Sequence, residues 1–249
     1  MVVLSDLEAY TNTLLNVQAF EDYAPNGVQV EGRPEVHRLV TGVTASRALI
    51  EAAIAWDADA ILVHHGYFWR GEDPRVVGMK RARLALLLDH GISLLAYHLP
   101  LDAHPELGNN AQLARLLGLE PEGKLDELGI GVYGRLGEAM SADDLGGLIE
   151  SALERAPLHV AGGPDPVRRI GWCTGAAQDL IEAAATAGLD AYISGEVSER
   201  TTHVARETGI HYFAAGHHAT ERYGVQALGE HLAGELSIQH RFIDIDNPV

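Results

Sequence analysis

The chain has 249 residues, enough for one large domain or two modest lobes, and it is 47% hydrophobic and 21% charged. This is the composition of a globular protein with a sizeable core. Its 35 acidic and 18 basic residues give a formal charge of -17, which repels phosphate backbones and anionic membranes, so general nucleic-acid binding is not expected. No apolar run approaches the roughly 18 residues of a membrane helix. The first residues also lack the basic start and apolar run of a signal peptide, so we expect a cytoplasmic protein.

Cysteine and histidine usage narrows the kinds of metal site that the chain can form. The single cysteine, Cys173, excludes both an intramolecular disulfide and a thiolate-rich zinc site within one chain. We expect Cys173 to be a small buried hydrophobic residue. Because the chain has 13 histidines, any metal ligands should be imidazole nitrogens and carboxylate oxygens.

The first half of the chain alternates between predicted strands and helices. Ser5 followed by Glu8 is a capping-box pattern, which predicts a helix reaching about Val17. Short β-rich runs then alternate with helix-like runs, which is typical of βαβ units in a mostly parallel sheet. The predicted strands are 38–43, 60–63 and 92–97, and the predicted helices between them are 47–56 and 79–90.

The same alternation returns after a middle segment, about 120–165, that is rich in glycine, proline and acidic residues and has a predicted helix after Ser141. With an offset of 131, residues 49–66 match residues 180–197 at seven of eighteen positions. With an offset of 119, His98 falls on His217 and Asp102 falls on Glu221. We therefore predict an α/β protein of two related α/β lobes with mostly parallel sheets, covering residues 1–125 and 126–249.

Paired histidines follow the strand predicted at 60–63. Ligand sites in open α/β sheets form at the carboxyl ends of the strands, where His64 and His65 lie. Neighbouring residues of a regular strand point to opposite faces, so both rings can serve one site only if the chain leaves the strand here, which Gly66 permits. The alternative is one core histidine and one exposed histidine.

Two further strand ends carry a histidine and a carboxylate four residues apart. His98 and Asp102 follow one predicted strand, and Pro100 between them predicts a loop because it prevents an uninterrupted helix. His217 and Glu221 follow another predicted strand and would share one face at the start of a helix. Taken singly, these features also fit a turn in which Asp102 caps a backbone amide and a solvated first turn of a helix.

The joint pattern favours a metal site, because the carboxyl ends of parallel strands lie along one edge of a sheet. Six nitrogen and oxygen ligands are too many for one tetrahedral zinc ion and suit a pair of divalent ions. The candidate metal ligands are His64, His65, His98, Asp102, His217 and Glu221.

Motifs along nearly the whole chain carry a family resemblance. They are DYAPNGVQV at 22–30, VTGVT at 40–44, HHGYFW at 64–69, HLPLDAHP at 98–105, GNN at 108–110 and GHHATE at 216–221. With these motifs the chain resembles the YbgI family, the Nif-three-like proteins often labelled type 2 homologues of GTP cyclohydrolase I. The resemblance implies a Nif-three-like fold, a dinuclear metal centre between the lobes and a ring-shaped homohexamer. By motif match the ligands of the family fall on His64, His65, Asp102, His217 and Glu221, with His98 close to the centre.

We expect a hydrolase that depends on two divalent metal ions per subunit and acts on a nucleotide-like or pterin-like small molecule, as the family label implies. Histidine and carboxylate sites accept Zn, Mn, Fe, Ni or Co. The alternative is a non-catalytic metal-binding hexameric ring that serves as a ligand-binding or stress- and DNA-damage-related scaffold. Two features stay open: Glu196 either orients a metal ligand or caps a helix, and residues 67–69 (Tyr-Phe-Trp) either stack on a ring of the substrate or form a lid or a subunit contact.

Overall fold

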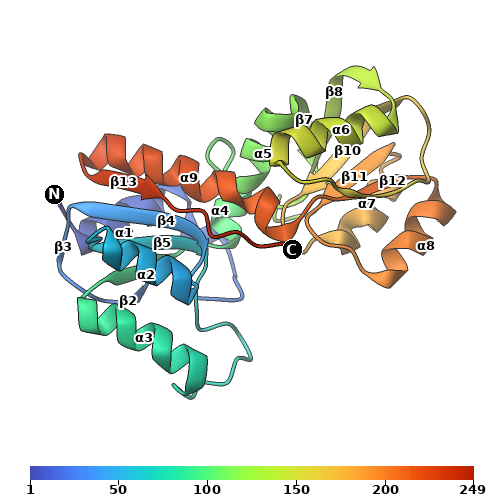
Figure 1. The fold of residues 1–249 in the computed structure, drawn as a ribbon. Coiled ribbons are helices and arrows are strands. Elements are labelled where there is room, and N and C mark those ends of the chain that lie inside the picture. Colours follow the sequence, from blue (N-terminus) through green and yellow to red (C-terminus); the bar gives the residue numbers. More distant parts are fainter. The chain divides into compact units, whose positions relative to one another are not determined.

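The computed structural model describes residues 1–249 and divides into two compact units. Unit 1 comprises Met1–Gly108 and Gly224–Asp246, and unit 2 comprises Asn109–Tyr223 and Asn247–Val249. Each unit is an α/β structure built around one main sheet (Figure 1). None of the helices combines the length and the apolar character that crossing a membrane requires.

The main sheet of unit 1 has the strand order β13-β4-β5-β6-β2, in which only the pairing of β2 with β6 is antiparallel. Its strands are β2 (Gly27–Val30), β4 (Arg38–Thr44), β5 (Ala60–His65), β6 (Ser93–Ala96) and β13 (Gln239–Phe242). A separate two-stranded sheet joins β1 (Val2–Val3) to β3 (Glu35–Val36). The helices are α1 (Leu4–Leu14), η1 (Val17–Ala19), α2 (Arg47–Ala55), α3 (Gly78–His90), α4 (Leu99–Ala103) and the part of α9 (His217–Leu236) from Gly224 onward.

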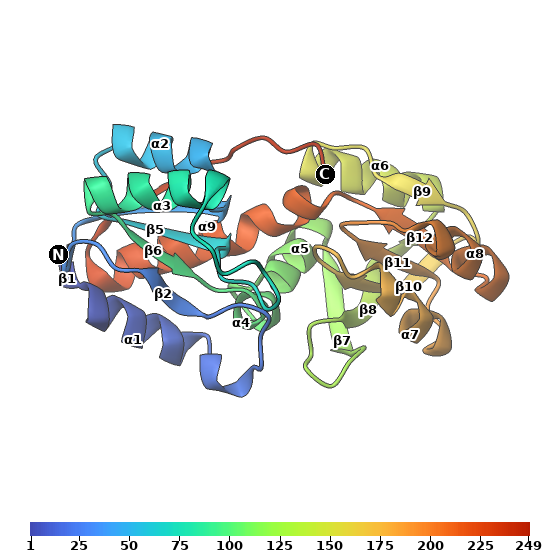
Figure 2. The same ribbon diagram turned by 90° about the horizontal axis from the view of Figure 1, so that it is seen from below.

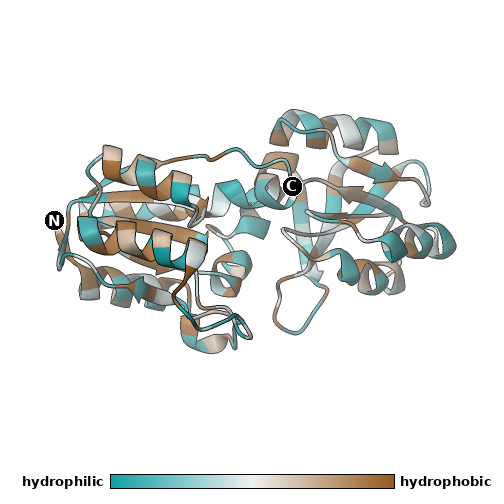
Figure 3. Cartoon of the chain, turned by 60° about the horizontal axis from the view of Figure 1, so that its bottom comes forward, coloured by the Kyte–Doolittle hydropathy of each residue, from teal (hydrophilic) through white to brown (hydrophobic).

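Helices cover both faces of this sheet, because consecutive side chains of a strand point to opposite faces. In β5, Leu62 packs in the cluster that contains the buried residues of α1 and α9, whereas Ile61 and Val63 pack with those of α2 and α3. Figure 2 shows α2 and α3 on one side of the sheet and α1 and α9 on the other. The strands between these layers are largely apolar in Figure 3, as both faces are buried.

The main sheet of unit 2 has the strand order β7-β8-β10-β11-β12-β9. Its strands are β7 (Leu119–Lys124), β8 (Val132–Met140), β9 (Leu158–Val160), β10 (Val167–Cys173), β11 (Ala191–Ser194) and β12 (His211–Ala214). The buried residues of α5 (Asn109–Leu117) and α6 (Ala142–Leu153) pack on one face, and those of α7 (Ile181–Thr186) and α8 (Glu199–Thr208) pack on the other. A short helix, η2 (Gln178–Leu180), precedes α7.

The predicted mostly parallel sheet describes unit 1, but in unit 2 only β10, β11 and β12 are mutually parallel. The middle segment adds β7, β8 and β9, which pair antiparallel and which its glycine, proline and acidic residues did not indicate. Pro121 is tolerated in the edge strand β7 because it sits where the register of β7 shifts. The predicted helix after Ser141 is confirmed, and the Ser141 side chain accepts a hydrogen bond from the Asp144 backbone N–H.

The internal repeat has a structural counterpart in two equivalent aspartates, which are related by the offset of 131. In unit 1, Asp59 Oδ2 accepts the backbone N–H groups of His37 and Arg38 at 2.8 and 3.0 Å. In unit 2, Asp190 Oδ2 accepts those of Arg168 and Arg169 at 2.9 and 2.8 Å. Asp59 directly precedes β5, and Asp190 directly precedes β11. Each aspartate therefore ties the start of its own strand to the start of the neighbouring strand, β4 or β10.

Two local predictions were wrong. Ser5 is the second residue of α1 and caps nothing, because β1 runs directly into the helix and Val3 occupies the N-cap position. Glu8 instead accepts the backbone N–H of Val28 at 2.7 Å. Pro100 lies in the first turn of α4 rather than in a loop, since the first turn of a helix does not need its backbone N–H.

Candidate metal centre

The carboxyl end of β5 brings two imidazole rings together in unit 1. His64 and His65 both belong to the strand, and their ring centroids are 4.5 Å apart. The side chain of His64 is completely buried, and its Nδ1 lies 2.9 Å from the carbonyl oxygen of Tyr97. A carbonyl oxygen only accepts, so Nδ1 carries a proton, and in the neutral imidazole Nε2 then carries the lone pair.

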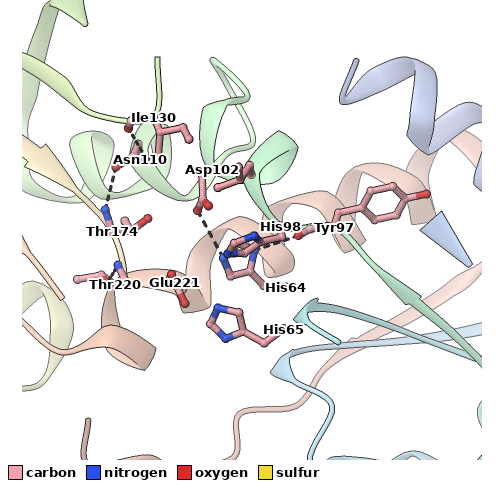
Figure 4. A network of polar contacts seen from close by, with 12 residues as sticks. His64, His65, Tyr97, His98, Asp102, Asn110, Ile130, Thr174, Thr220 and Glu221 are labelled. Carbon is pink, nitrogen blue, oxygen red and sulfur yellow. Dashed lines mark hydrogen bonds and ion pairs between the residues drawn. The ribbon is translucent and has the colours of Figure 1, made fainter. Parts of the chain in front are cut away.

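His98 and Asp102 lie close to this pair. The ligand nitrogens of His64, His65 and His98 all lie within 4.8 Å of one another, and Asp102 Oδ1 is 3.5 Å from His64 Nε2. Figure 4 shows the ring of His64 between the Tyr97 carbonyl and the Asp102 carboxylate. Unit 1 therefore brings together the four candidate ligands that the sequence places in it.

The carboxylate of Asp22, which is not among the candidate ligands, contacts the Nδ1 side of the His98 ring. Asp22 Oδ1 lies 2.8 Å from His98 Nδ1, and the Asp22 side chain is only 3% exposed. Burial by itself raises the pKa of Asp22, but hydrogen bonds from His98 and Asn26 outweigh it and lower the pKa below the usual value. Its place in the motif at 22–30 was the only sequence signal.

In unit 2, the first turn of α9 places His217 and Glu221 on one face. His217 Nε2 is 3.2 Å from Glu221 Oε2, and His217 Nδ1 is 2.7 Å from Glu196 Oε1. Burial by itself lowers the pKa of His217, but the hydrogen bonds and charges of Glu221 and Glu196 outweigh it and raise the pKa to about 9. Of the two alternatives for Glu196, the structure therefore shows the one in which it orients His217.

The loop after β10 lies directly against this pair. Gly175 has φ +68°, and a Cβ built on it would lie 2.2 Å from Glu221 Oε1 and 3.1 Å from His217 Nε2. A side chain at Gly175 would therefore occupy the space that the two candidate ligands need.

The donor chemistry fits divalent transition-metal ions. His64, His98 and His217 each direct Nδ1 at an oxygen acceptor, namely a carbonyl or a carboxylate. Metal-binding histidines are held in this way, because the partner of Nδ1 fixes the ring and leaves Nε2 as the ligand atom. The single cysteine is buried in unit 2, as predicted, so the donors are nitrogen and oxygen.

The aromatic residues 67–69 after His65 differ in their surroundings. Tyr67 is buried and its hydroxyl donates to the carbonyl of Ala45 at 2.7 Å, so it is part of the core. Burial raises its pKa to about 12, which keeps the hydroxyl protonated at neutral pH. Trp69 meets His98 edge to face with the ring centroids 5.0 Å apart, and its indole N–H donates to the carbonyl of Gly66. Phe68 is exposed, with Lys80 Nζ 5.0 Å from its ring centroid. Stacking of a substrate ring therefore stays a prediction for Phe68 and Trp69.

Comparison with known proteins gives consistent matches over the whole chain. The sequence profile of the DUF34/NIF3 (NGG1p interacting factor 3) family matches residues 2–248. A Pseudomonas aeruginosa protein named GTP cyclohydrolase 1 type 2 homolog is 57% identical over 250 residues, which cover 99% of each chain. A solved structure described as protein ybgI, of unknown function, is 51% identical with a TM-score of 0.98, and one from Thermus thermophilus is 32% identical with a TM-score of 0.90; both matches cover 100% of each chain.

Proposed function

Because the chain belongs to the DUF34/NIF3 family, we propose that it is a metal-dependent hydrolase acting on a nucleotide-like or pterin-like small molecule. The substrate class rests on the name of its relatives, GTP cyclohydrolase 1 type 2 homolog. The metal dependence rests on the side chains themselves. The observation that carries it is the grouping of candidate ligand atoms at the carboxyl end of β5, with the proton of His64 held on Nδ1.

The chain is proposed to bind two divalent metal ions, with Zn, Mn, Fe, Ni and Co as the candidates. The sequence offers six nitrogen or oxygen donors at three strand ends. Their number exceeds what one tetrahedral ion accepts, which supports a pair of ions. The proposed ligands are His64, His65, His98, Asp102, His217 and Glu221.

A pair of divalent ions supplies an activated water and polarises a substrate oxygen or nitrogen, which is the chemistry of hydrolysis at neutral pH. The residues of the chain prepare the ligands for this role. The Tyr97 carbonyl holds the proton of His64 on Nδ1, and Glu196 holds a proton of His217 on Nδ1. With a pKa of about 9, His217 also carries a proton on Nε2 at neutral pH in the metal-free protein. If His217 holds a metal ion through Nε2, that nitrogen would have to give up its proton.

The test is the metal content of freshly purified protein together with a hydrolysis screen of nucleotides and pterins, with and without restored metal. We expect about two ions per chain and turnover that depends on them. The variants His64→Ala and Glu221→Ala should lose metal and turnover while staying folded. His231→Ala is the matched control, because this histidine bonds Tyr10 and belongs to neither ligand set.

The same screen distinguishes the hydrolase from the alternative function, a non-catalytic metal-binding protein. Two ions without turnover of any compound would favour the non-catalytic role, in which the metal ions bind a ligand or a partner. No specific metal binding would refute both roles. Unchanged turnover in a verified metal-free variant would refute the hydrolase alone.

As in the resemblance described above, we propose a homohexameric ring in the cytoplasm. Light scattering should then give a mass six times the 26.8 kDa of one chain, and a monomeric mass would refute the ring.

A further inference from the structure

Asp22 is a buried carboxylate whose hydrogen-bonding capacity is completely used. Its Oδ1 accepts from the Tyr23 backbone N–H at 2.6 Å and lies 2.8 Å from His98 Nδ1. Its Oδ2 accepts from Asn26 Nδ2 and from the Leu99 backbone N–H, both at 2.9 Å. A carboxylate offers about four acceptor positions, so no position is left for another donor.

The directions of these bonds follow from the backbone. The His98 backbone N–H can only donate, and its acceptor is Asn26 Oδ1 at 2.8 Å. The amide of Asn26 is therefore oriented with Nδ2 toward Asp22. Three of the four groups around Asp22 can thus only donate. The fourth is His98 Nδ1, and since an imidazole is a stronger base than a carboxylate, the proton between them lies on the imidazole and Asp22 accepts from all four groups.

This arrangement decides where His98 carries its proton. Because Asp22 acts only as an acceptor, His98 Nδ1 must be the donor of their 2.8 Å hydrogen bond. A neutral His98 then has its proton on Nδ1 and its lone pair on Nε2. Without the carboxylate, both tautomers become accessible, and the Nε2–H tautomer cannot bind a metal through that nitrogen.

Asp22 also fixes the start of α4, the helix that carries Asp102. The N-cap residue of α4 is His98, which makes no side-chain cap hydrogen bond. The first backbone N–H of the helix, from Leu99, is bonded by Asp22 instead. An acceptor at this position does what an N-cap side chain normally does, although it lies 77 residues away in the sequence.

We propose that Asp22 is a positioning residue for two metal ligands of unit 1, since its carboxylate selects the His98 tautomer that presents Nε2 and secures the start of the helix that carries Asp102. This inference rests on the metal-binding role proposed above. One carboxylate would then set both the protonation of one ligand and the location of another.

The experiment uses the full chain and the variant Asp22→Asn. An amide of the same shape has one acceptor oxygen and one donor nitrogen, so at least two of the four donors lose their partner. In metal-free protein, nitrogen-15 NMR of the His98 ring should show the Nδ1–H tautomer in the wild type and a population of the Nε2–H tautomer in the variant. In calorimetric titration with Co²⁺, the affinity of the variant should fall about 10- to 100-fold.

Asp59→Asn is the matched control. Asp59 lies in the same unit with a side chain only 13% exposed, and it accepts the backbone N–H groups of His37 and Arg38. This variant loses the carboxylate charge that faces Arg33 but should keep the Co²⁺ affinity and the tautomer of His98. If Asp22→Asn does not fold, Asn26→Ala removes one donor from Asp22 and should lower the Co²⁺ affinity to a smaller extent.

Two results would overturn the inference: an unchanged His98 tautomer and Co²⁺ affinity in Asp22→Asn, or equal losses of affinity in the Asp22 and Asp59 variants. A wild-type protein that binds no Co²⁺ would count against the proposed function. The tautomer comparison in metal-free protein would still decide the role of Asp22.

Discussion

Replacing Gly175 by alanine should weaken metal binding far more than it weakens the fold. Two effects act at this position. The residue has φ +68°, which disfavours any side chain, and a Cβ would lie 2.2 Å from Glu221 Oε1. An ordinary contact begins at about 3.4 Å, so the carboxylate of Glu221 has to move by more than an ångström.

The two effects have different magnitudes and different consequences. A left-handed backbone conformation costs a non-glycine residue about 1–2 kcal/mol of stability. A displacement of a functional group by about 1 Å lowers the activity that depends on its position on the order of 100-fold. Because Glu221 is buried, with a side chain only 4% exposed, it has little room to return to its place.

Gly188→Ala separates these effects. Gly188 lies in the same unit and has φ +66°, but a Cβ there would meet no atom within 4 Å. Urea unfolding should show a similar loss of stability in both variants. Zn²⁺ or Co²⁺ titration should show a loss of affinity, about 10- to 100-fold, only in Gly175→Ala. Wild-type affinity in Gly175→Ala would refute the reasoning that Glu221 needs this space to bind metal.

Three further predictions concern other parts of the chain. The pKa of His217 is raised from 6.5 to about 9, so its contribution to the stability of the metal-free protein is complete below pH 6.5 and is lost as the pH rises through 9. Urea unfolding across this range should show the fall, and Glu196→Gln should make it smaller. Cys173 is 1% exposed, so a thiol reagent should modify it only after unfolding; rapid modification of the native protein would contradict its burial. Asp59→Ala and Asp190→Ala should each lower the free energy of unfolding by about 1–3 kcal/mol, because each leaves backbone N–H groups without their acceptor; a neutral effect at both would show that the repeated contact adds no stability.

Local patterns in the sequence were sufficient for most of the βαβ framework. The strands predicted at 38–43 and 60–63 correspond to β4 and β5, and the helices predicted at 47–56 and 79–90 correspond to α2 and α3. These predictions worked because side-chain direction repeats with a period of 2 in a strand and 3.6 in a helix, so an apolar face is visible in the sequence. For the same reason, the ends of the strands could be located, and with them His64, His98 and His217.

Contacts between distant segments depended on the tertiary structure. Nothing local to His98 indicates that its Nδ1 meets Asp22, 76 residues away, and Ser5 loses its capping role only because β1 pairs with β3. The middle segment likewise forms antiparallel strands because an existing sheet edge pairs with it, although its composition is typical of turns. The sequence by itself determined which side chains lie at the ends of the strands, because local periodicity encodes local structure. Only the folded chain determined which acceptor holds each imidazole, because a hydrogen bond between remote segments depends on how all the elements between them pack.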